Sequence, residues 1–104
     1  MPSKSKAKGN RFEKLVEQMT IDAGIPAKRA WGSNGAALGH HEEVDVLIDN
    51  KIKVQCKVRK VIANWMLPTE HVDIQVIKQD RDIPYAVIPY DEYLNLLLKS
   101  ANRP

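Results

Sequence analysis

The stretch EVDVLIDNKIKVQCKVRK, residues 43–60, decides the fold of this chain. Apolar side chains occupy every second position on both sides of residues 49–51. An alternation of period two is typical of β-strands that bury one face. The stretch therefore predicts a hairpin, in which two strands are joined by a tight turn at Asp49, Asn50 and Lys51.

The apolar pattern also predicts the register of this hairpin. A two-residue loop would place Val46 opposite Lys53 and mix apolar with polar side chains on one face. A three-residue loop, in which Asn50 suits the left-handed backbone that such loops often need, gathers six apolar side chains on one face. They form the pairs Ile48–Ile52, Val46–Val54 and Val44–Cys56. Because a slip of one residue would turn one strand over, the pattern favours the three-residue loop.

The same register gathers polar side chains on the opposite face of the hairpin. Asp45 lies directly across from Gln55, and Lys57 follows two residues later. An acid, an amide and an ammonium group are thus expected at one place. Taken alone, Asp45 and Lys57 are equally consistent with an exposed ion pair between strands, which contributes less than about 1 kcal/mol.

Composition bounds the class of protein. A chain of 104 residues with 43% hydrophobic and 28% charged residues is expected to form one soluble globular domain. The sequence contains neither an apolar run of roughly 20 residues nor a secretory signal, so we expect a cytoplasmic protein without a membrane partner. Cys56 is the single cysteine, which excludes an internal disulfide, and we interpret it as a small apolar core residue in a reducing compartment.

Charge is distributed unevenly along the chain. Residues 1–60 contain 12 basic and 7 acidic residues, whereas residues 61–104 contain 4 basic and 6 acidic residues. The basic half is the half that contains the hairpin. This asymmetry favours a polyanionic partner, most often nucleic acid, although a basic surface that only meets solvent is the alternative.

The N-terminal segment predicts a flexible basic tail over residues 1–8 and a helix that begins near Gly9 or Asn10. Gly24 is expected to end this helix, and Pro26 prevents its continuation. Asn10 and Glu13 have the spacing of a capping box, which from local sequence is the favoured role of Glu13. The predicted apolar stripe consists of Phe12, Leu15, Val16, Met19 and Ala23.

The remaining elements complete an α/β fold. We expect a strand over residues 27–31, a mobile glycine-rich loop over 32–41, a polar turn over 79–82, and a strand over 85–89. Helices are expected over residues 70–79 and 92–100. This order predicts a single domain over residues 9–100, with a mixed central β-sheet flanked by helices.

Three elements can bring reactive side chains together. The first helix offers Glu13, one hairpin strand offers Asp45, and the other offers Gln55 and Lys57. Hydrolysis of a phosphodiester needs a divalent metal held by hard oxygen ligands, and a cation near the attacking water. The four side chains supply these groups, so the sequence predicts a metal-dependent nuclease site.

An acid in a first helix, an Asp in a strand and a (D/E)xK triplet about ten residues later resemble the PD-(D/E)xK nucleases. Here the pattern is Glu13, Val44-Asp45 and Gln55-Cys56-Lys57. The segments KGNRFEKLVEQM, KRAWGSNGA and IPYAVIPYDEYLNLL resemble, more specifically, the archaeal-type Holliday-junction resolvases, which include phage members. The resemblance covers about residues 8–98 and implies a restriction-endonuclease-like core.

The resemblance also implies roles for individual residues. Glu13, Asp45 and Gln55 would hold Mg²⁺, or Mn²⁺, and Lys57 would orient water or stabilise charge. The resemblance further implies a homodimer that nicks two opposed strands of a four-way DNA junction during recombination and repair. The residues expected to contact DNA are Arg11, Arg29, Ser33, Arg59 and Lys60.

Gln55 departs from the pattern, because an acid usually stands there. A Gln carbonyl can bind a hard cation, but it removes one negative charge from the site. Three interpretations stay open: a natural active variant, a natural weak or inactive variant, or a substitution introduced to trap substrate. His40, His41 and His71 lack metal-ligand spacing, so we expect them to lie in solvated loops.

Overall fold

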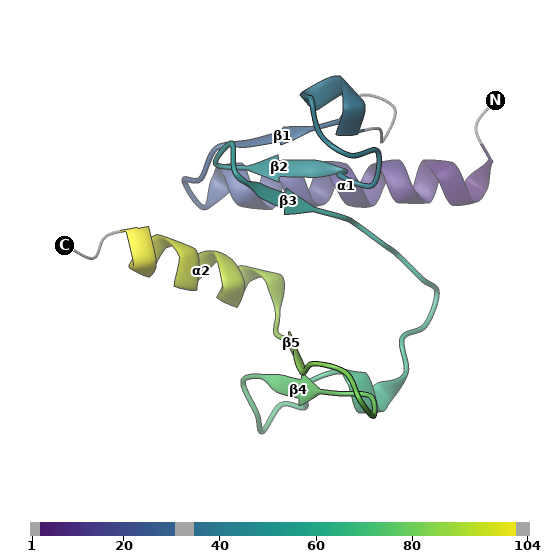
Figure 1. Cartoon of the computed structure of the whole chain (residues 1–104), viewed down its shortest axis with the longest axis vertical. Helices are drawn as coiled ribbons and strands as arrows, with labels where there is room; N and C mark the ends of the chain where they lie inside the picture. Colours follow the sequence, from purple (N-terminus) through teal and green to yellow (C-terminus); the bar gives the residue numbers. More distant parts are fainter. Residues whose placement is uncertain (1–2, 31–34, 102–104) are drawn as a thin grey trace. The chain divides into compact units, whose positions relative to one another are not determined.

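A computed structural model describes residues 3–30 and 35–101 of the chain (Figure 1). The chain divides into two compact units, Met1–Val58 and Arg59–Pro104, which are described separately. The first unit holds helix α1, strands β1 to β3 and the short 3₁₀ helix η2. The second unit holds η3, strands β4 and β5 and helix α2. The predicted single domain over residues 9–100 stays a prediction.

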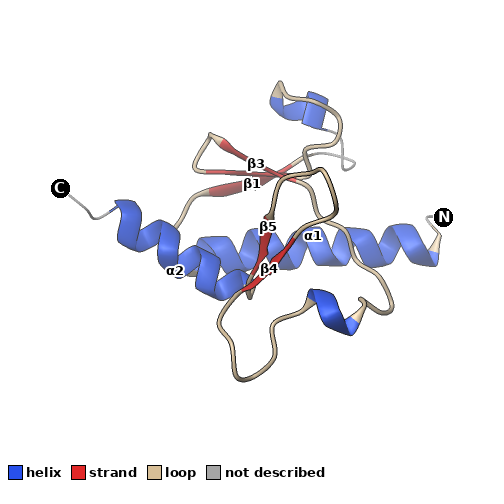
Figure 2. Ribbon diagram, turned by 60° about the horizontal axis from the view of Figure 1, so that its bottom comes forward, coloured by secondary structure: helices blue, strands red, loops and turns tan. Residues whose placement is uncertain are grey.

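Helix α1 (Lys4–Asp22) packs against a three-stranded antiparallel sheet in the order β1-β2-β3. Figures 1 and 2 show the strands together on one side of this helix. The strands are β1 (Ala27–Arg29), β2 (Val46–Ile48) and β3 (Ile52–Val54). The buried apolar side chains of this unit are Val16, Ile25, Ala30, Val44, Val46, Leu47 and Ile48.

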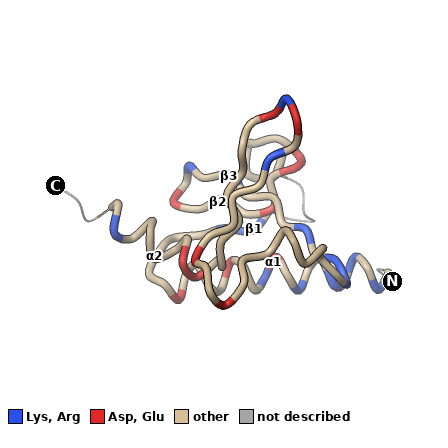
Figure 3. The backbone as a smooth tube through the Cα atoms, turned by 90° about the horizontal axis from the view of Figure 1, so that it is seen from below, with Lys and Arg blue, Asp and Glu red and all other residues tan. Residues whose placement is uncertain are grey.

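The predicted start of α1 is wrong. Ser3 caps the helix by accepting a hydrogen bond from the backbone N–H of Lys6 at 3.1 Å, so residues 4–8 are helical and do not form a flexible tail. Lys and Arg residues therefore line the first turns of the helix (Figure 3). Asn10 and Glu13 lie inside the helix, which excludes the predicted capping box.

The predicted end of α1 is confirmed. Gly24 has a φ of 93°, and its N–H donates to the carbonyl of Ile21 at 2.9 Å. The N–H of Ile25 donates to the carbonyl of Thr20 at 3.1 Å. These two bonds form a Schellman motif, which needs a left-handed residue at the position of Gly24. Of the predicted apolar stripe, Leu15 is 53% exposed.

The hairpin has the predicted register. Ile48 pairs with Ile52 and Val46 with Val54, so residues 49–51 form the loop. Asn50 has a φ of 57°, as its position predicts, and Asp49 is also left-handed, with a φ of 54°. The N–H of Lys51 donates to the carbonyl of Ile48 at 3.1 Å and closes the turn.

Residues 35–41, ahead of β2, are held by backbone contacts. Gly35 begins the 3₁₀ helix η2 (Gly35–Leu38) and is buried. A Cβ added at Gly35 would lie 1.9 Å from the carbonyl oxygen of His41, so no other residue fits there without displacement. The backbone N–H of His40 donates to the carbonyl of Gly35 at 2.9 Å. This close approach fixes the path of the chain into β2.

The second unit differs from expectation between residues 70 and 79. This segment contains strand β4 (Gln75–Ile77) instead of the predicted helix. Strand β4 pairs antiparallel with β5 (Tyr85–Val87), through the predicted polar turn at residues 79–82. Branched residues at every second position, Val72, Ile74 and Val76, favour a strand because they lose side-chain freedom in a helix.

The final helix and a short connecting helix complete this unit. Helix α2 (Tyr90–Ala101) is longer than the predicted 92–100, and its Leu94 is buried. The 3₁₀ helix η3 (Asn64–Met66) lies ahead of β4. Its Trp65 is 67% exposed.

The α/β class is confirmed, but the predicted mixed sheet is not found in residues 3–30 and 35–101. These residues form two sheets, and every strand pair in them is antiparallel. The reason is local. Parallel pairing needs a long crossover, commonly a helix, and residues 70–79 form a strand instead of that helix.

Candidate metal and nucleic-acid site

Asp45 lies at the point where β2 begins, and backbone hydrogen bonds hold it on both sides. Its carbonyl accepts the N–H of Ala30 at 2.9 Å, and its N–H donates to the carbonyl of Val54 at 2.8 Å. Its carboxylate Oδ2 accepts the backbone N–H of Cys56 at 2.7 Å. The side chain is 8% exposed. Asp45 is therefore a buried acid whose carboxylate is fixed against the strand that carries Gln55.

Glu13 is the second buried acid of the first unit. Its side chain is 4% exposed and lies on the same face of α1 as the buried Val16 and Thr20. Because α1 begins at Lys4, Glu13 does not serve the helix terminus. Burial of an ionised carboxylate costs several kcal/mol unless other groups compensate for the lost water.

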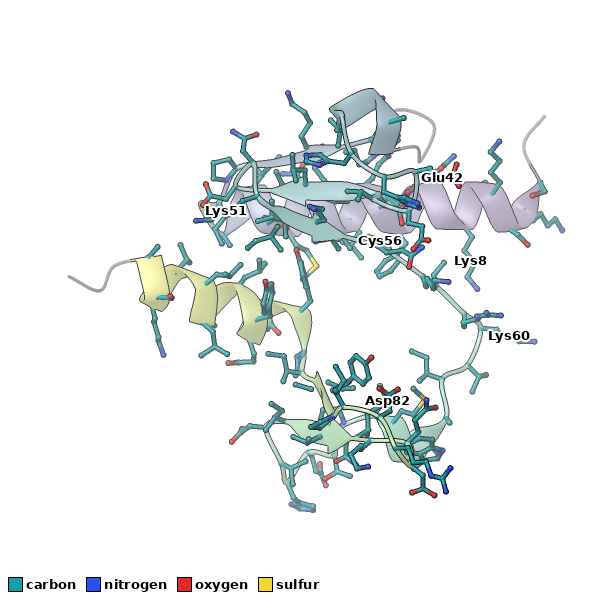
Figure 4. The ribbon with its side chains drawn as sticks, viewed as in Figure 1. Lys8, Glu42, Lys51, Cys56, Lys60 and Asp82 are labelled. Atoms are coloured by element: carbon teal, nitrogen blue, oxygen red, sulfur yellow. The ribbon has the colours of Figure 1, made fainter. Side chains whose placement is uncertain are left out.

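The pKa of the Cys56 thiol responds to both of these acids. Burial, and after it the negative charges of Asp45 and Glu13, together raise the pKa of Cys56 from 9.0 to about 12. Both carboxylates must lie near the sulfur atom to act on it. Figure 4 labels Cys56, which follows β3. Helix α1, which carries Glu13, also contacts strand β2, which begins directly after Asp45.

Two buried carboxylates are hard oxygen donors of the kind that Mg²⁺ and Mn²⁺ prefer. In the described part of the chain, no three side chains of the His, Cys, Asp and Glu types are grouped as a metal site. A divalent ion at Glu13 and Asp45 would therefore need ligands of another kind. Amide oxygen, backbone carbonyl, phosphate oxygen and water all fit a hard cation.

Gln55 and Lys57 are both exposed on the polar face of the hairpin. By register, Gln55 lies opposite Asp45, one step beyond the Val46–Val54 pair. Gln55 also lines an open hollow of about 320 Å³ together with His41, Glu43, Val44, Lys53 and Val54. The structure thus fixes the two acids by burial, whereas the amide and the ammonium group stay free to turn toward a ligand.

Arg29 lies against the turn of α1 that carries Glu13. Its Nη1 donates to the carbonyl of Asn10 at 3.3 Å, and its backbone N–H donates to Oε2 of Glu17 at 2.8 Å. These partners lie three residues before and four residues after Glu13. The guanidinium group is therefore held close to the helix near the candidate site. Its predicted contact with phosphate stays a prediction.

Four other residues are predicted to contact DNA. Arg11 is exposed on α1, and Arg59 and Lys60 are exposed at the start of the second unit. Ser33 lies outside the described residues. Their roles in DNA binding stay predictions.

The histidines are placed in exposed or partly exposed turns. His41 Nδ1 accepts the backbone N–H of Glu43 at 3.1 Å, and His71 Nε2 lies 3.5 Å from the carboxylate of Glu70. Both of these histidine side chains are exposed. The arrangement agrees with the expected loop positions.

Sequence reasoning missed two residues of this site. Glu17 is an acid one turn after Glu13 on the half-buried side of α1, and this spacing could have indicated a contact with β1. Cys56 was expected to be a core residue, but its backbone N–H holds Asp45 and the pKa of its thiol responds to both acids. No side-chain pattern could have predicted a role for a backbone N–H.

A scan of protein-family profiles, a search of curated proteins and a search of solved structures each found no match. No helix in the described ranges has the length and apolar character needed to cross a bilayer.

Proposed function

We propose that this protein is a metal-dependent endonuclease that cuts DNA at four-way junctions. The observation that carries the proposal is the burial of two acids on packed elements: Glu13 on α1, which contacts β2, and Asp45 at the start of β2, whose carboxylate accepts the N–H of Cys56. Cys56 is the central residue of the Gln55-Cys56-Lys57 triplet that resembles (D/E)xK. The proposed core is restriction-endonuclease-like.

The residues would divide the chemistry of phosphodiester hydrolysis. Glu13 and Asp45 would hold Mg²⁺ or Mn²⁺, with the amide oxygen of Gln55 as a third ligand. The bound ion would polarise the phosphoryl group and favour hydroxide at neutral pH. Lys57 would orient the attacking water or stabilise the charge that develops on the phosphate oxygens.

The substrate proposal rests on charge and on the resemblance to junction resolvases. The half of the chain that holds both acids has an excess of five positive charges, which suits a phosphate backbone. A two-fold homodimer would present two such sites to opposed strands of a nearly two-fold junction. In sedimentation, the dimer would have about twice the 11.8 kDa mass of one chain.

Gln55 provides the most informative variant. Gln55→Glu would restore a third carboxylate and strengthen Mg²⁺ binding, because each added negative charge favours a divalent cation. A titration of cleavage rate against Mg²⁺ would then reach half its maximum at a lower concentration than in the wild type. An unchanged titration would remove Gln55 from the ligand set.

The test of function is incubation of a labelled four-way junction and a matched linear duplex with Mg²⁺. We expect paired nicks in the junction and little cutting of the duplex. Asp45→Asn should abolish cleavage while junction binding persists, and this variant serves as the matched control. If neither substrate is cut, and Gln55→Glu restores nothing, the enzyme proposal fails.

Two alternatives follow from specific features. Gln55 favours a DNA-junction-binding module that has kept a nuclease fold without catalysis, with binding that falls steeply with salt. In that module Asp45→Asn would change binding only through lost charge repulsion. A nuclease of the same fold that acts on flaps or duplex sites would prefer those substrates in competition with a junction.

A further inference from the structure

The first turns of α1 carry a row of exposed cations. With 3.6 residues per turn, Lys4, Lys8 and Arg11 fall on one side of the helix, and Lys14 borders them. All four side chains are exposed. Figure 3 shows the basic residues along the N-terminal half of α1. These four residues are called the cationic row.

The cationic row faces away from the candidate metal site. Glu13 follows Arg11 by two residues and therefore points to the opposite side of α1, where Val16 and Thr20 are also buried. In Figure 1 the N-terminal part of α1 runs past the ends of the three strands, and Figure 4 labels Lys8 on this part. A ligand on the row would therefore lie on a different side of the helix from a ligand at Glu13.

The row is unfavourable for the helix alone. Cations near a helix N-terminus oppose the helix dipole, and the first turn contains no acidic residue. Lys4 and Lys8 are like charges four residues apart, which repel, and Gly9 adds a further cost inside the helix. Among the described residues, no ion pair involves Lys4, Lys8 or Arg11. An anionic partner would relieve this repulsion.

We propose that the cationic row binds the phosphate backbone of a duplex segment other than the one at Glu13 and Asp45. Four basic side chains along three helical turns suit a regular line of phosphates. An anionic membrane suits the row less well, because an interfacial helix exposes a broad apolar face and Val16 here packs inward. The second segment rests on the proposed function, since a branched substrate offers more than one duplex arm.

The test compares Lys4→Glu/Lys8→Glu with Lys6→Glu in the full chain. All three changes put an acid near the helix N-terminus, so each should stabilise α1 rather than unfold it. Lys6 lies on the other side of the helix and is the matched control. Binding to a four-way junction is measured by fluorescence anisotropy in EDTA, over a range of salt concentrations, with thermal unfolding of each variant.

We expect the double variant to weaken junction binding at least tenfold and to lower the slope of log K against log salt by about two, with an unchanged or higher Tm. Lys6→Glu should change the slope by less than one. Equal effects of the two variants, or an unchanged slope in the double variant, would overturn the proposal. Tighter binding to anionic vesicles than to the junction would also overturn it.

The metal-free assay separates this inference from catalysis. If the wild type binds the junction through the row but never cuts it with Mg²⁺, the nuclease proposal fails and the row keeps its role. If the wild type cuts junctions and the double variant binds and cuts as well as it does, the nuclease proposal stands and the row has no role.

Discussion

The carboxylate of Asp45 has a positional role that can be measured apart from its charge. Asp45→Asn and Asp45→Ala both remove the charge, but only Asn keeps an oxygen that can accept the N–H of Cys56. We therefore expect the Ala variant to have a free energy of unfolding about 1 kcal/mol lower than that of the Asn variant. Urea unfolding of the two variants provides the comparison, and equal stabilities would show that the hydrogen bond contributes nothing.

The thiol of Cys56 gives a pH-dependent signature of the same site. Its pKa is 9.0 when unperturbed and about 12 in the folded protein, because burial, Asp45 and Glu13 all disfavour the thiolate. Between these values the unfolded chain has lost a proton that the folded protein keeps. The free energy of unfolding therefore falls as the pH rises through this window.

Cys56→Ser removes this contribution. From about pH 8.5 to about pH 10.5, the free energy of unfolding of the wild type should fall more steeply than that of the variant. Circular dichroism during urea unfolding at several pH values would measure both curves. Parallel curves would mean that the pKa of the thiol is not raised in the folded protein.

The sequence predicts some properties of these residues but not others. Asp45 and its position across from Gln55 follow from the alternation of apolar residues, which is a local signal. The burial of Glu13 does not follow from a local signal. Asn10 and Glu13 have the same spacing whether the helix begins before them or at them. The cap at Ser3, a short polar residue outside any apolar pattern, decides between the two.

Helix α1 offers a matched pair of glycines at the scale of one element. Gly9 lies inside the helix and Gly24 lies at its left-handed end, and an added Cβ would meet nothing within 4 Å at either site. Gly9→Ala should raise the free energy of unfolding by about 0.5–1 kcal/mol. Gly24→Ala should lower the free energy of unfolding by about 1–2 kcal/mol, because alanine is strained in the left-handed backbone conformation of Gly24.

Thermal and urea unfolding of both variants would test this pair. Since the chemical change is identical, an effect of the same sign at both positions would contradict the described ends of α1. The comparison also separates backbone conformation from packing, because neither methyl group would contact a neighbour.

Elements with a strictly local signal were predicted best. Short-range patterns predict three such features: the hairpin register, the end of α1 at Gly24 and the turn at residues 79–82. The predicted helix over residues 70–79 is wrong, because this segment contains strand β4. Strand β4 instead forms by pairing with β5, whose contribution lies about ten residues further along the chain.

In the molecule as a whole, the excess of basic residues and the two buried acids lie in the same half of the chain. The first unit holds both buried acids and the cationic row, whereas residues 61–104 carry more acidic than basic residues. The uneven charge could be read from the sequence alone. The sequence alone could not show that the row and the acids occupy opposite sides of α1. That arrangement depends on where the helix begins and on which of its faces packs on the sheet.

The proposed nuclease site requires Glu13 and Asp45 to bind a divalent metal near Cys56. Titration of the ¹⁵N-labelled protein with Mn²⁺, followed by NMR, tests this most directly, because the paramagnetic ion broadens only the signals of nearby amides. We predict early loss of the Cys56 amide signal in the wild type and its persistence in Asp45→Asn. A Cys56 signal that survives in the wild type while amides near Asp80 and Asp82 broaden would contradict the account.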